Sequence, residues 1–324
     1  MTHSEDLRFR AGDASLAGTL ALPDAPDGAR LPWAVLVGSW LPRDRDGSWD
    51  RARHPEWFAA RAPDTPDGPL ARLADALADH GVATFRYDPR GCGASDGDWA
   101  GTDLFTRIDD VRDAIGAMRS REELDLRRTA VIGHGEGAVI ALSVAIGDPA
   151  VGAIGLLAPG SRSWRDLLRR GVAHRERTRQ DREHPIVDAI DRWSEDLLER
   201  AERREPVAAI PVAGSTVRLS LVGWEQAIHT PALALATMLH RPAVLAHAAD
   251  DAWSDPDESR LLAGVLRAGG NDPLLQLIDG GGHDLAGAPD AAIEGFAASL
   301  AARMAPRALP PVLLAIEEMT GPRD

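Results

Sequence analysis

The feature that most constrains the fold of this chain is an alternation between short apolar runs and segments with helical spacing. Residues 34–37 and 151–157 are continuous apolar runs, which are typical of strands buried on both faces. Between such runs, large apolar residues recur every three or four positions. The expected strands of this part are 34–37, 82–87, 130–132 and 151–157, and the expected helices 70–79, 105–118 and 139–146. This alternation predicts an α/β fold with a mainly parallel sheet and helices on both faces.

The alternation stops between residues 160 and 240, where arginine, glutamate and periodic Leu and Ile indicate helices. It then resumes with two further strands and helices. An insertion that leaves from the carboxyl end of a parallel strand would roof the site that forms there. The expected organisation is a core in two parts, 1–159 and 241–304, a helical cap, 160–240, and a C-terminal extension, 305–324. An additional hairpin is expected at residues 8–22.

Composition excludes several classes of protein. The formal net charge of −14 argues against a nucleic-acid partner, because phosphates would be repelled. The single cysteine, Cys92, excludes an internal disulfide, and the scattered histidines lack metal-ligand spacing, so no metal is expected. The chain has no lysine, so Schiff-base chemistry is excluded. No dinucleotide-binding glycine motif follows the first parallel strand, and we expect no organic cofactor.

The sequence also bears on location and partners. No apolar run reaches 18 residues, so no membrane span is expected. Residues 1–10 are polar and lack the apolar stretch of a secretory signal, which favours a cytoplasmic protein. The sequence leaves open whether the protein forms a homodimer, because the apolar stretch 312–319 can pack on its own core or on a second copy.

The segment that carries chemical information is residues 129–141. The strand 130–132 runs into Gly133-His134-Gly135-Glu136-Gly137 and then into a helix. A strand, a sharp turn and a helix form the nucleophile elbow, in which the central residue is Ser, Cys or Asp. Gly135 occupies that central position and has no side chain, so it cannot be a nucleophile.

Three segments in order resemble the α/β-hydrolase superfamily, in particular its serine esterase and acyl-peptidase-like branch. They are Val37-Gly38-Ser39-Trp40 with the polar residues 43–48, the loop 86–95 with Asp88-Pro89-Arg90-Gly91-Cys92, and the elbow. The resemblance covers residues 16–304, apart from the detail of the insertion. It implies cleavage of esters, amides or thioesters, with a small molecule as substrate.

The resemblance also implies the positions of the other catalytic groups. The acid is expected in the loop after strand 243–246, where the spacing favours Asp251 over Asp250, and the base is expected at His283. The oxyanion hole would use the backbone N–H of Glu136 and that of Ser39 or Trp40. Such donors contribute about 3 kcal/mol each to transition-state stabilisation.

The chain thus has an acid, a base and oxyanion donors without the nucleophile, and three explanations stay open. His283, oriented by Asp251, can act as a general base on water or on a substrate proton, giving direct hydrolysis, a lyase, a cyclisation or an isomerisation. Alternatively, a serine esterase was silenced by a substitution at Gly135. The third explanation is a noncatalytic binding protein that kept the pocket.

Further residues are candidates for the substrate pocket. His134 and three tryptophans, Trp164, Trp193 and Trp224, are expected to line it, since aromatic walls suit an apolar or ring-bearing substrate. Cys92 is a packing residue rather than a substitute nucleophile, because nothing near it in the sequence would lower the pKa of its thiol.

Overall fold

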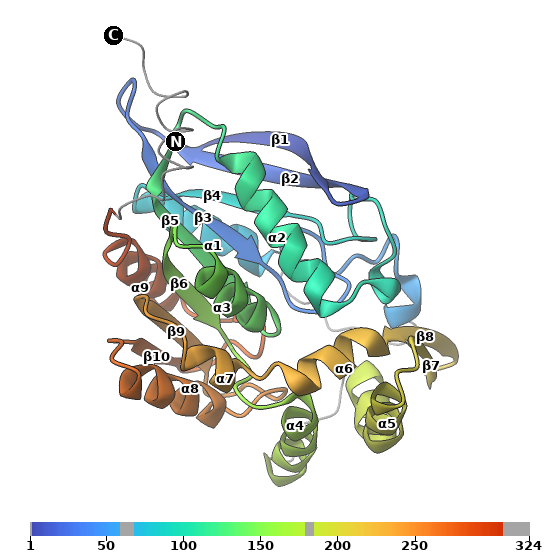
Figure 1. Ribbon diagram of the computed structural model, residues 1–324. Coiled ribbons are helices and arrows are strands. Elements are labelled where there is room, and N and C mark those ends of the chain that lie inside the picture. The colour runs from blue at the N-terminus through green and yellow to red at the C-terminus, as the bar shows by residue number, and fades with distance from the viewer. Residues whose placement is uncertain (1, 59–67, 179–184, 307–324) are drawn as a thin grey trace.

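The computed structural model describes residues 2–58, 68–178 and 185–306. Its main element is an eight-stranded sheet in the order β1-β2-β4-β3-β5-β6-β9-β10 (Figure 1). The strands are β1 (Thr2–Ala11), β2 (Ala14–Pro23), β3 (Leu31–Val37), β4 (Ala83–Tyr87), β5 (Leu124–His134), β6 (Val151–Leu157), β9 (Ala243–Ala248) and β10 (Leu274–Ile278). The β1–β2 hairpin joins β4 in antiparallel fashion, and every pairing from β4 to β10 is parallel. The predicted fold class is therefore confirmed.

Helices cover both faces of this sheet, as the alternating pattern predicts. One face carries α1 (Pro69–Asp79) and α9 (Asp290–Ala301), which pack on each other and on the sheet. The other face carries α2 (Leu104–Met118), α3 (Gly137–Gly147) and α8 (Asp257–Ala268). Because β3, β5, β6 and β9 are apolar on both faces, two separate hydrophobic cores hold the sheet between the helical layers.

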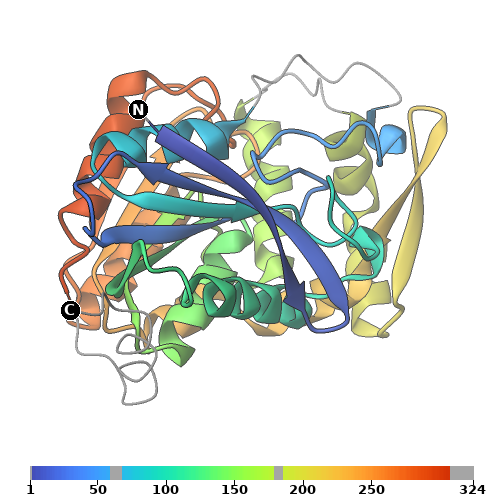
Figure 2. The same ribbon diagram turned by 90° about the horizontal axis from the view of Figure 1, so that it is seen from above.

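Most of the insertion, defined here as residues 160–240 between β6 and β9, gathers at one end of the sheet, and its last helix packs on α3 and α8 at one face (Figure 2). It contains α4 (Trp164–Thr178), α5 (Pro185–Glu202), β7 (Val207–Val212), β8 (Ser215–Ser220), α6 (Leu221–His229) and α7 (Ala232–Ala236). A third hydrophobic core joins it to the loops that follow β3 and β4, including the short 3-10 helices η1 (Pro55–Phe58) and η2 (Trp99–Gly101). Most of the insertion therefore packs at the carboxyl ends of the parallel strands.

The expectation that the insertion is wholly helical is wrong. Strands β7 and β8 form an antiparallel hairpin whose alternate residues, such as Ile210 and Val217, are buried. The turn between them is Ala213-Gly214, with φ angles of +46° and +88°. Two consecutive residues with positive φ fit the right-handed twist of a hairpin, which is why a glycine stands at this turn.

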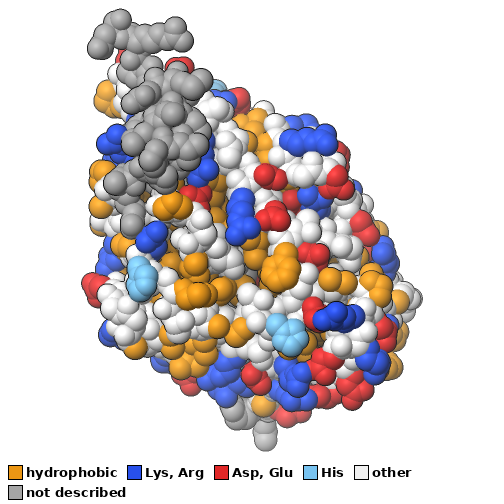
Figure 3. Space-filling view, in the orientation of Figure 1, with side chains coloured by type: hydrophobic (Ala, Val, Ile, Leu, Met, Phe, Trp, Pro, Cys, Tyr) orange, Lys and Arg blue, Asp and Glu red, His pale blue; other side chains and the backbone are white. Residues whose placement is uncertain are grey.

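The surface carries both signs of charge. On the face seen in Figure 3, acidic and basic side chains are interspersed rather than gathered into a basic patch. Within the described parts of the chain, no helix combines the length and the apolar character that crossing a bilayer requires. The apolar stretch 312–319, with most of the expected extension 305–324, lies outside the described residues.

Candidate active site

The turn between β5 and α3 is tight, and its outer glycines are required by close backbone contacts. A Cβ added to Gly133 would lie 2.0 Å from the carbonyl oxygen of Gly137, and a Cβ added to Gly137 would lie 2.6 Å from the carbonyl oxygen of Val37. Gly135, between them, has a φ of +57°. The strand-turn-helix geometry of a nucleophile elbow is therefore present around a glycine.

The central position of this turn faces His283. A Cβ built on Gly135 would lie 3.4 Å from Nε2 of His283 and 3.5 Å from Oγ of Ser39. These are ordinary contact distances, so the surroundings leave room for a small side chain at position 135. The structure thus brings the elbow, the loop after β3 and the loop after β10 together.

His283 is held by a buried carboxylate. Its Nδ1 lies 2.8 Å from Oδ2 of Asp251, which is fully buried in the loop after β9. The other carboxylate oxygen, Oδ1, accepts hydrogen bonds from the backbone N–H groups of Trp253 and Ser254 at 2.7 and 2.9 Å. Asp250, the alternative acid, instead accepts a hydrogen bond from the N–H of Gly282.

These contacts set the protonation of the pair. Burial by itself raises the pKa of Asp251, but the charge of His283 and hydrogen bonds from two histidines outweigh it and hold that pKa well below its usual range. Burial by itself lowers the pKa of His283, but the charge and hydrogen bond of Asp251 raise it on balance. A charged carboxylate thus orients the imidazole and makes it more basic.

A second histidine that the sequence analysis misses also contacts the acid. His247, fully buried in β9, places Nε2 3.0 Å from Oδ2 of Asp251 and 3.1 Å from the carbonyl oxygen of Ser254. Both partners are acceptors, so Nε2 carries a proton; Nδ1 lies 2.7 Å from Oγ of Ser259. A histidine inside an apolar strand gives no sequence signal of this role.

Three residues whose backbone N–H groups have no described partner line the same pocket. The N–H groups of Ser39, Trp40 and Glu136 form no hydrogen bond to any residue that the structure describes. Glu136 stands at the start of α3, and its side chain pairs with Arg107 of α2 at 2.9 Å. Burial raises the pKa of that carboxyl, and Arg107 opposes the rise. The side chain of Glu136 is therefore part of an ion pair, and its N–H has no partner among the described residues.

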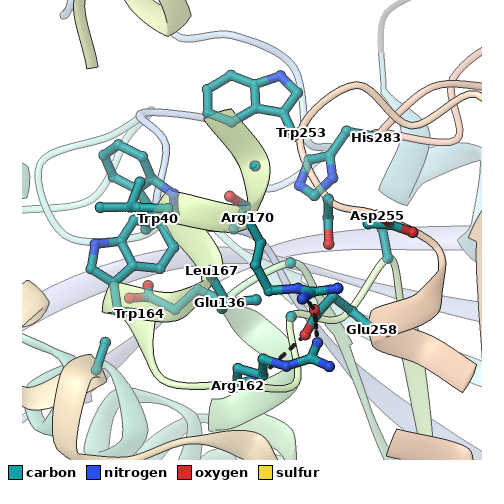
Figure 4. A pocket seen from close by; sticks show the side chains of 18 of the residues that line it. Trp40, Glu136, Arg162, Trp164, Leu167, Arg170, Trp253, Asp255, Glu258 and His283 are labelled. Atoms are coloured by element: carbon teal, nitrogen blue, oxygen red, sulfur yellow. Dashed lines mark hydrogen bonds and ion pairs between the residues drawn. The ribbon is translucent and has the colours of Figure 1, made fainter. Parts of the chain in front are cut away.

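A pocket of about 980 Å³, counted to its open mouth, lies over this site. The core supplies Ser39, Trp40, Gly135, Glu136, Trp253, Asp255, Glu258 and His283, and the insertion supplies Arg162, Trp164, Leu167, Leu168, Arg170, Val187 and Ile190 among others. Figure 4 shows Trp40 and Trp164 together on one side of the pocket, with His283 and Asp255 on the other. Trp253, which the sequence analysis does not assign to the pocket, lies with its ring 6.0 Å from that of His283.

Three of the residues expected to line the pocket lie elsewhere. His134 is buried behind His283, where its Nε2–H donates to the carbonyl oxygen of His283 at 2.9 Å; burial lowers its pKa to about 4, helped by the charge of His283. Trp193 is 38% exposed on α5, away from the pocket lining. Trp224 is buried behind Trp40 and Trp164, at ring distances of 6.1 and 5.4 Å. Helical spacing alone cannot tell which side of a helix faces a pocket.

One cluster of the described residues has metal-ligand chemistry. Ligand atoms of Asp50, His54 and Cys92 lie within 4.8 Å of one another. Each polar atom already has a protein partner, since Nε2 of His54 lies 2.9 Å from the carbonyl oxygen of Gly91 and Oδ2 of Asp50 accepts from the N–H of Gly93. Burial raises the pKa of the Cys92 thiol, which opposes the thiolate that a metal or a nucleophile needs. The cluster fits a role in holding the loop.

The parallel sheet, the elbow and the His283–Asp251 pair define an enzyme of the α/β-hydrolase type. The model of the serine aminopeptidase S33 hydrolase family matches residues 68–290, so the chain belongs to that family. No curated protein matches the chain.

Solved structures share the fold at low identity. The α/β-hydrolase GrgF from Penicillium sp. sh18 has a TM-score of 0.56 at 19% identity, over 87% of this chain and 91% of its own. Est1E from Butyrivibrio proteoclasticus, bound to ferulic acid, has a TM-score of 0.61 at 13% identity, over 91% of this chain and 96% of its own. The acylaminoacyl peptidase of Pyrococcus horikoshii has a TM-score of 0.59 at 17% identity, over 91% of this chain but 40% of its own.

Proposed function

We propose that this protein cleaves a small acyl or ester substrate by direct attack of water, with His283 as general base and no acyl-enzyme. The observation that carries the proposal is the position of Gly135. The point where a side chain would begin lies 3.4 Å from Nε2 of His283 and 3.5 Å from Oγ of Ser39. A water near that point would have an acceptor for its proton and a hydroxyl partner.

The contacts of His283 suit it to this role. Nδ1 of His283 is hydrogen-bonded to Asp251, and Nε2 is the ring atom that faces Gly135. The raised pKa of the imidazole makes it a better base. The carbonyl oxygen of His283 is fixed by His134. A noncatalytic binding protein has no need of an imidazole oriented by a buried carboxylate.

The reaction balances without a further reactant. Nε2 of His283 takes a proton from water as the water oxygen bonds to the carbonyl carbon of the substrate. The negative charge that develops on the carbonyl oxygen is stabilised by the N–H groups of Glu136 and of Ser39 or Trp40. When the tetrahedral intermediate collapses, the bond to the leaving alkoxide breaks and His283 returns the proton to it. The products are an acid and an alcohol.

The walls of the pocket favour an apolar or aromatic group on the substrate. Trp40 and Trp164 lie 5.8 Å apart in an edge-to-face arrangement and both line the pocket. Leu167, Val187 and Ile190 of the insertion extend this wall. The insertion therefore acts as a cap, because it supplies much of the surface that would hold the substrate and exclude bulk water.

The test is hydrolysis of p-nitrophenyl esters of increasing acyl length by the native chain and by His283→Gln. A general base contributes about 10²- to 10⁴-fold to rate, and we expect a loss in this range. His229→Gln, at a site on α6 whose side chain is 69% exposed, is the matched control and should keep the native rate. Equal turnover by the native chain and His283→Gln would contradict the proposal.

A further inference from the structure

The wall of the pocket opposite the tryptophans carries an unusual group of charges. Arg162 and Arg170 of the insertion both reach Glu258 at the start of α8 (Figure 4). The carboxylate of Glu258 has only 2% of its side chain exposed. One buried negative charge is thus shared between two guanidinium groups that line the pocket.

Glu258 is already saturated by donors. Its Oε2 accepts hydrogen bonds from the N–H and Oγ–H of Ser161 and from the N–H of Arg162, while Oε1 accepts from Nη1 of Arg162. Nε of Arg170 lies at the longer distance of 3.3 Å from the same oxygen, and no hydrogen bond joins the two side chains. Arg162 is therefore the principal partner of this carboxylate, and Arg170 is the surplus positive charge.

The other charges of the pocket have partners of their own. Glu136 pairs with Arg107 and Arg175 pairs with Asp191. Asp255 lies 3.6 Å from Nδ1 of His174, a contact that is an ion pair only when that imidazole is protonated. Arg170 has no ion-pair partner other than Glu258 among the described residues, and its Nη1 and Nη2 form no hydrogen bond to them. Its side chain is 45% exposed although it lines the pocket.

We propose that Arg170, with Arg162 beside it, binds a carboxylate on the substrate, so that the substrate class is an ester or acyl compound with one apolar arm and one anionic arm. A planar guanidinium with two free Nη groups matches a carboxylate in a bidentate pair. The apolar arm would lie on Trp40 and Trp164, with the reacting carbonyl beside His283. This inference rests on the proposed function, because it takes the pocket as the substrate site.

The test uses three unreactive probes that differ only at one end: 4-phenylbutyrate, 4-phenylbutanamide and 4-phenylbutylamine. Their dissociation constants are measured by calorimetry with the native chain. We expect the carboxylate to bind about 10-fold or more tighter than the amide, because hydrogen bonds to a charged group are stronger than those to a neutral one. No binding of the carboxylate, equal binding of carboxylate and amide, or tighter binding of the amine would each overturn the inference.

Variants of two neighbouring arginines separate a specific carboxylate site from a general effect of net charge. Arg170→Gln should abolish most of the preference for the carboxylate and leave amide binding within about two-fold. Arg169→Gln removes the same charge one position away, where Arg169 pairs with Glu195 outside the pocket lining, and should keep the preference. An equal loss in both variants would indicate a general effect of net charge and overturn the inference.

The inference and the proposed function fail in different ways. His283→Gln should lose turnover and keep the preference for 4-phenylbutyrate, because the carboxylate end lies on the arginine wall. If turnover depends on His283 but the native chain binds carboxylate and amide equally, only the carboxylate site is overturned. If the native chain prefers the carboxylate but its turnover does not depend on His283, the hydrolytic function is overturned and the carboxylate site is retained.

Discussion

At the scale of single residues, Gly135 decides which chemistry the site can perform. The sequence alone predicts the elbow, because a strand, three spaced glycines and a helix follow one another within 129–141. It also predicts that His283 and Asp251 stand in loops after strands, and the structure places them 2.8 Å apart. It could not reveal His247, whose contact with Asp251 depends on the path of the loop between β9 and α8.

Replacing Gly135 by serine should create a complete nucleophile, base and acid. We expect Gly135→Ser to show an acyl-enzyme burst with p-nitrophenyl acetate, because its Oγ would start from a Cβ 3.4 Å from Nε2 of His283. The φ of +57° makes a side chain unfavourable here, and we expect unfolding in denaturant to be easier by about 1–2 kcal/mol. A folded Gly135→Ser protein without a burst would count against descent from a silenced serine enzyme.

The rate of hydrolysis should depend on pH through His283. Only the neutral imidazole is a base, so activity should rise with pH through a midpoint above the ordinary value of 6.5, because Asp251 raises the pKa of His283. The contribution of His283 to folding stability depends on pH in the opposite direction to the rate. It is present below pH 6.5 and is lost as the pH rises through the raised pKa of His283. A pH–rate profile of kcat/KM measures the midpoint.

The Asp251→Asn variant is the control for this profile. It removes the charge that raises the pKa of His283, and burial then lowers that pKa. We expect the midpoint to move to lower pH and the maximal rate to fall. A profile whose midpoint is unchanged in Asp251→Asn would show that a different group titrates.

At the scale of elements, the close contact between β5 and α3 fixes the elbow. A Cβ on Gly133 would lie 2.0 Å from the carbonyl oxygen of Gly137. Neither the end of β5 nor the start of α3 can move to relieve this contact without separating the strand from the helix. This need for glycine follows from strand–helix packing rather than from local conformation, since Gly133 does not have a positive φ.

The Gly133→Ala variant should therefore be strongly destabilised. A contact of 2.0 Å with backbone forces backbone shifts, and overpacking costs about 1–3 kcal/mol and occasionally more, so we expect a loss at the upper end of this range. Gly116→Ala, on the exposed side of α2 with no atom within 4 Å of the added Cβ, should instead stabilise the protein by about 0.5–1 kcal/mol. Urea unfolding of both variants checks the pair, and a Gly133→Ala protein as stable as the native chain would contradict the packing.

The β7–β8 hairpin marks where sequence reasoning fails at this scale. In β8, Val217 and Leu219 alternate with polar residues, which is a strand signal of period two. The longer helical periodicity of 164–202 hides that signal when the whole insertion is treated as one unit. The core strands, in contrast, were predictable because buried parallel strands are short, apolar and separated by helices.

At the scale of the whole molecule, the insertion is coupled to the loop that carries Asp251. The Nε2–H of His174, on α4, donates to the carbonyl oxygen of Asp251 at 3.0 Å. Nη1 of Arg175 donates to the carbonyl oxygens of Ala252 and Trp253, and the same guanidinium pairs with Asp191 of α5. A displacement of the insertion would therefore move the loop that holds His283. No sequence pattern could show this, because the partners are 77 residues apart in the chain.

Loss of Arg175 should consequently weaken both the fold and the site. Arg175 and Asp191 are buried, and removing one partner of a buried ion pair costs about 3–5 kcal/mol. We expect Arg175→Met to unfold in less denaturant and to lower the hydrolytic rate. Arg169→Met breaks an exposed pair between the same two helices and should change stability by less than about 1 kcal/mol. Equal effects in the two variants would contradict the coupling.

The most direct measurement is the intact mass of the protein, quenched during turnover of an aryl ester, with Gly135→Ser as the control that accumulates an acyl group. If water attacks the substrate directly, the native chain turns over the ester and keeps its unmodified mass at every time point. An acylated native chain, on Ser39 or any other residue, would contradict the account.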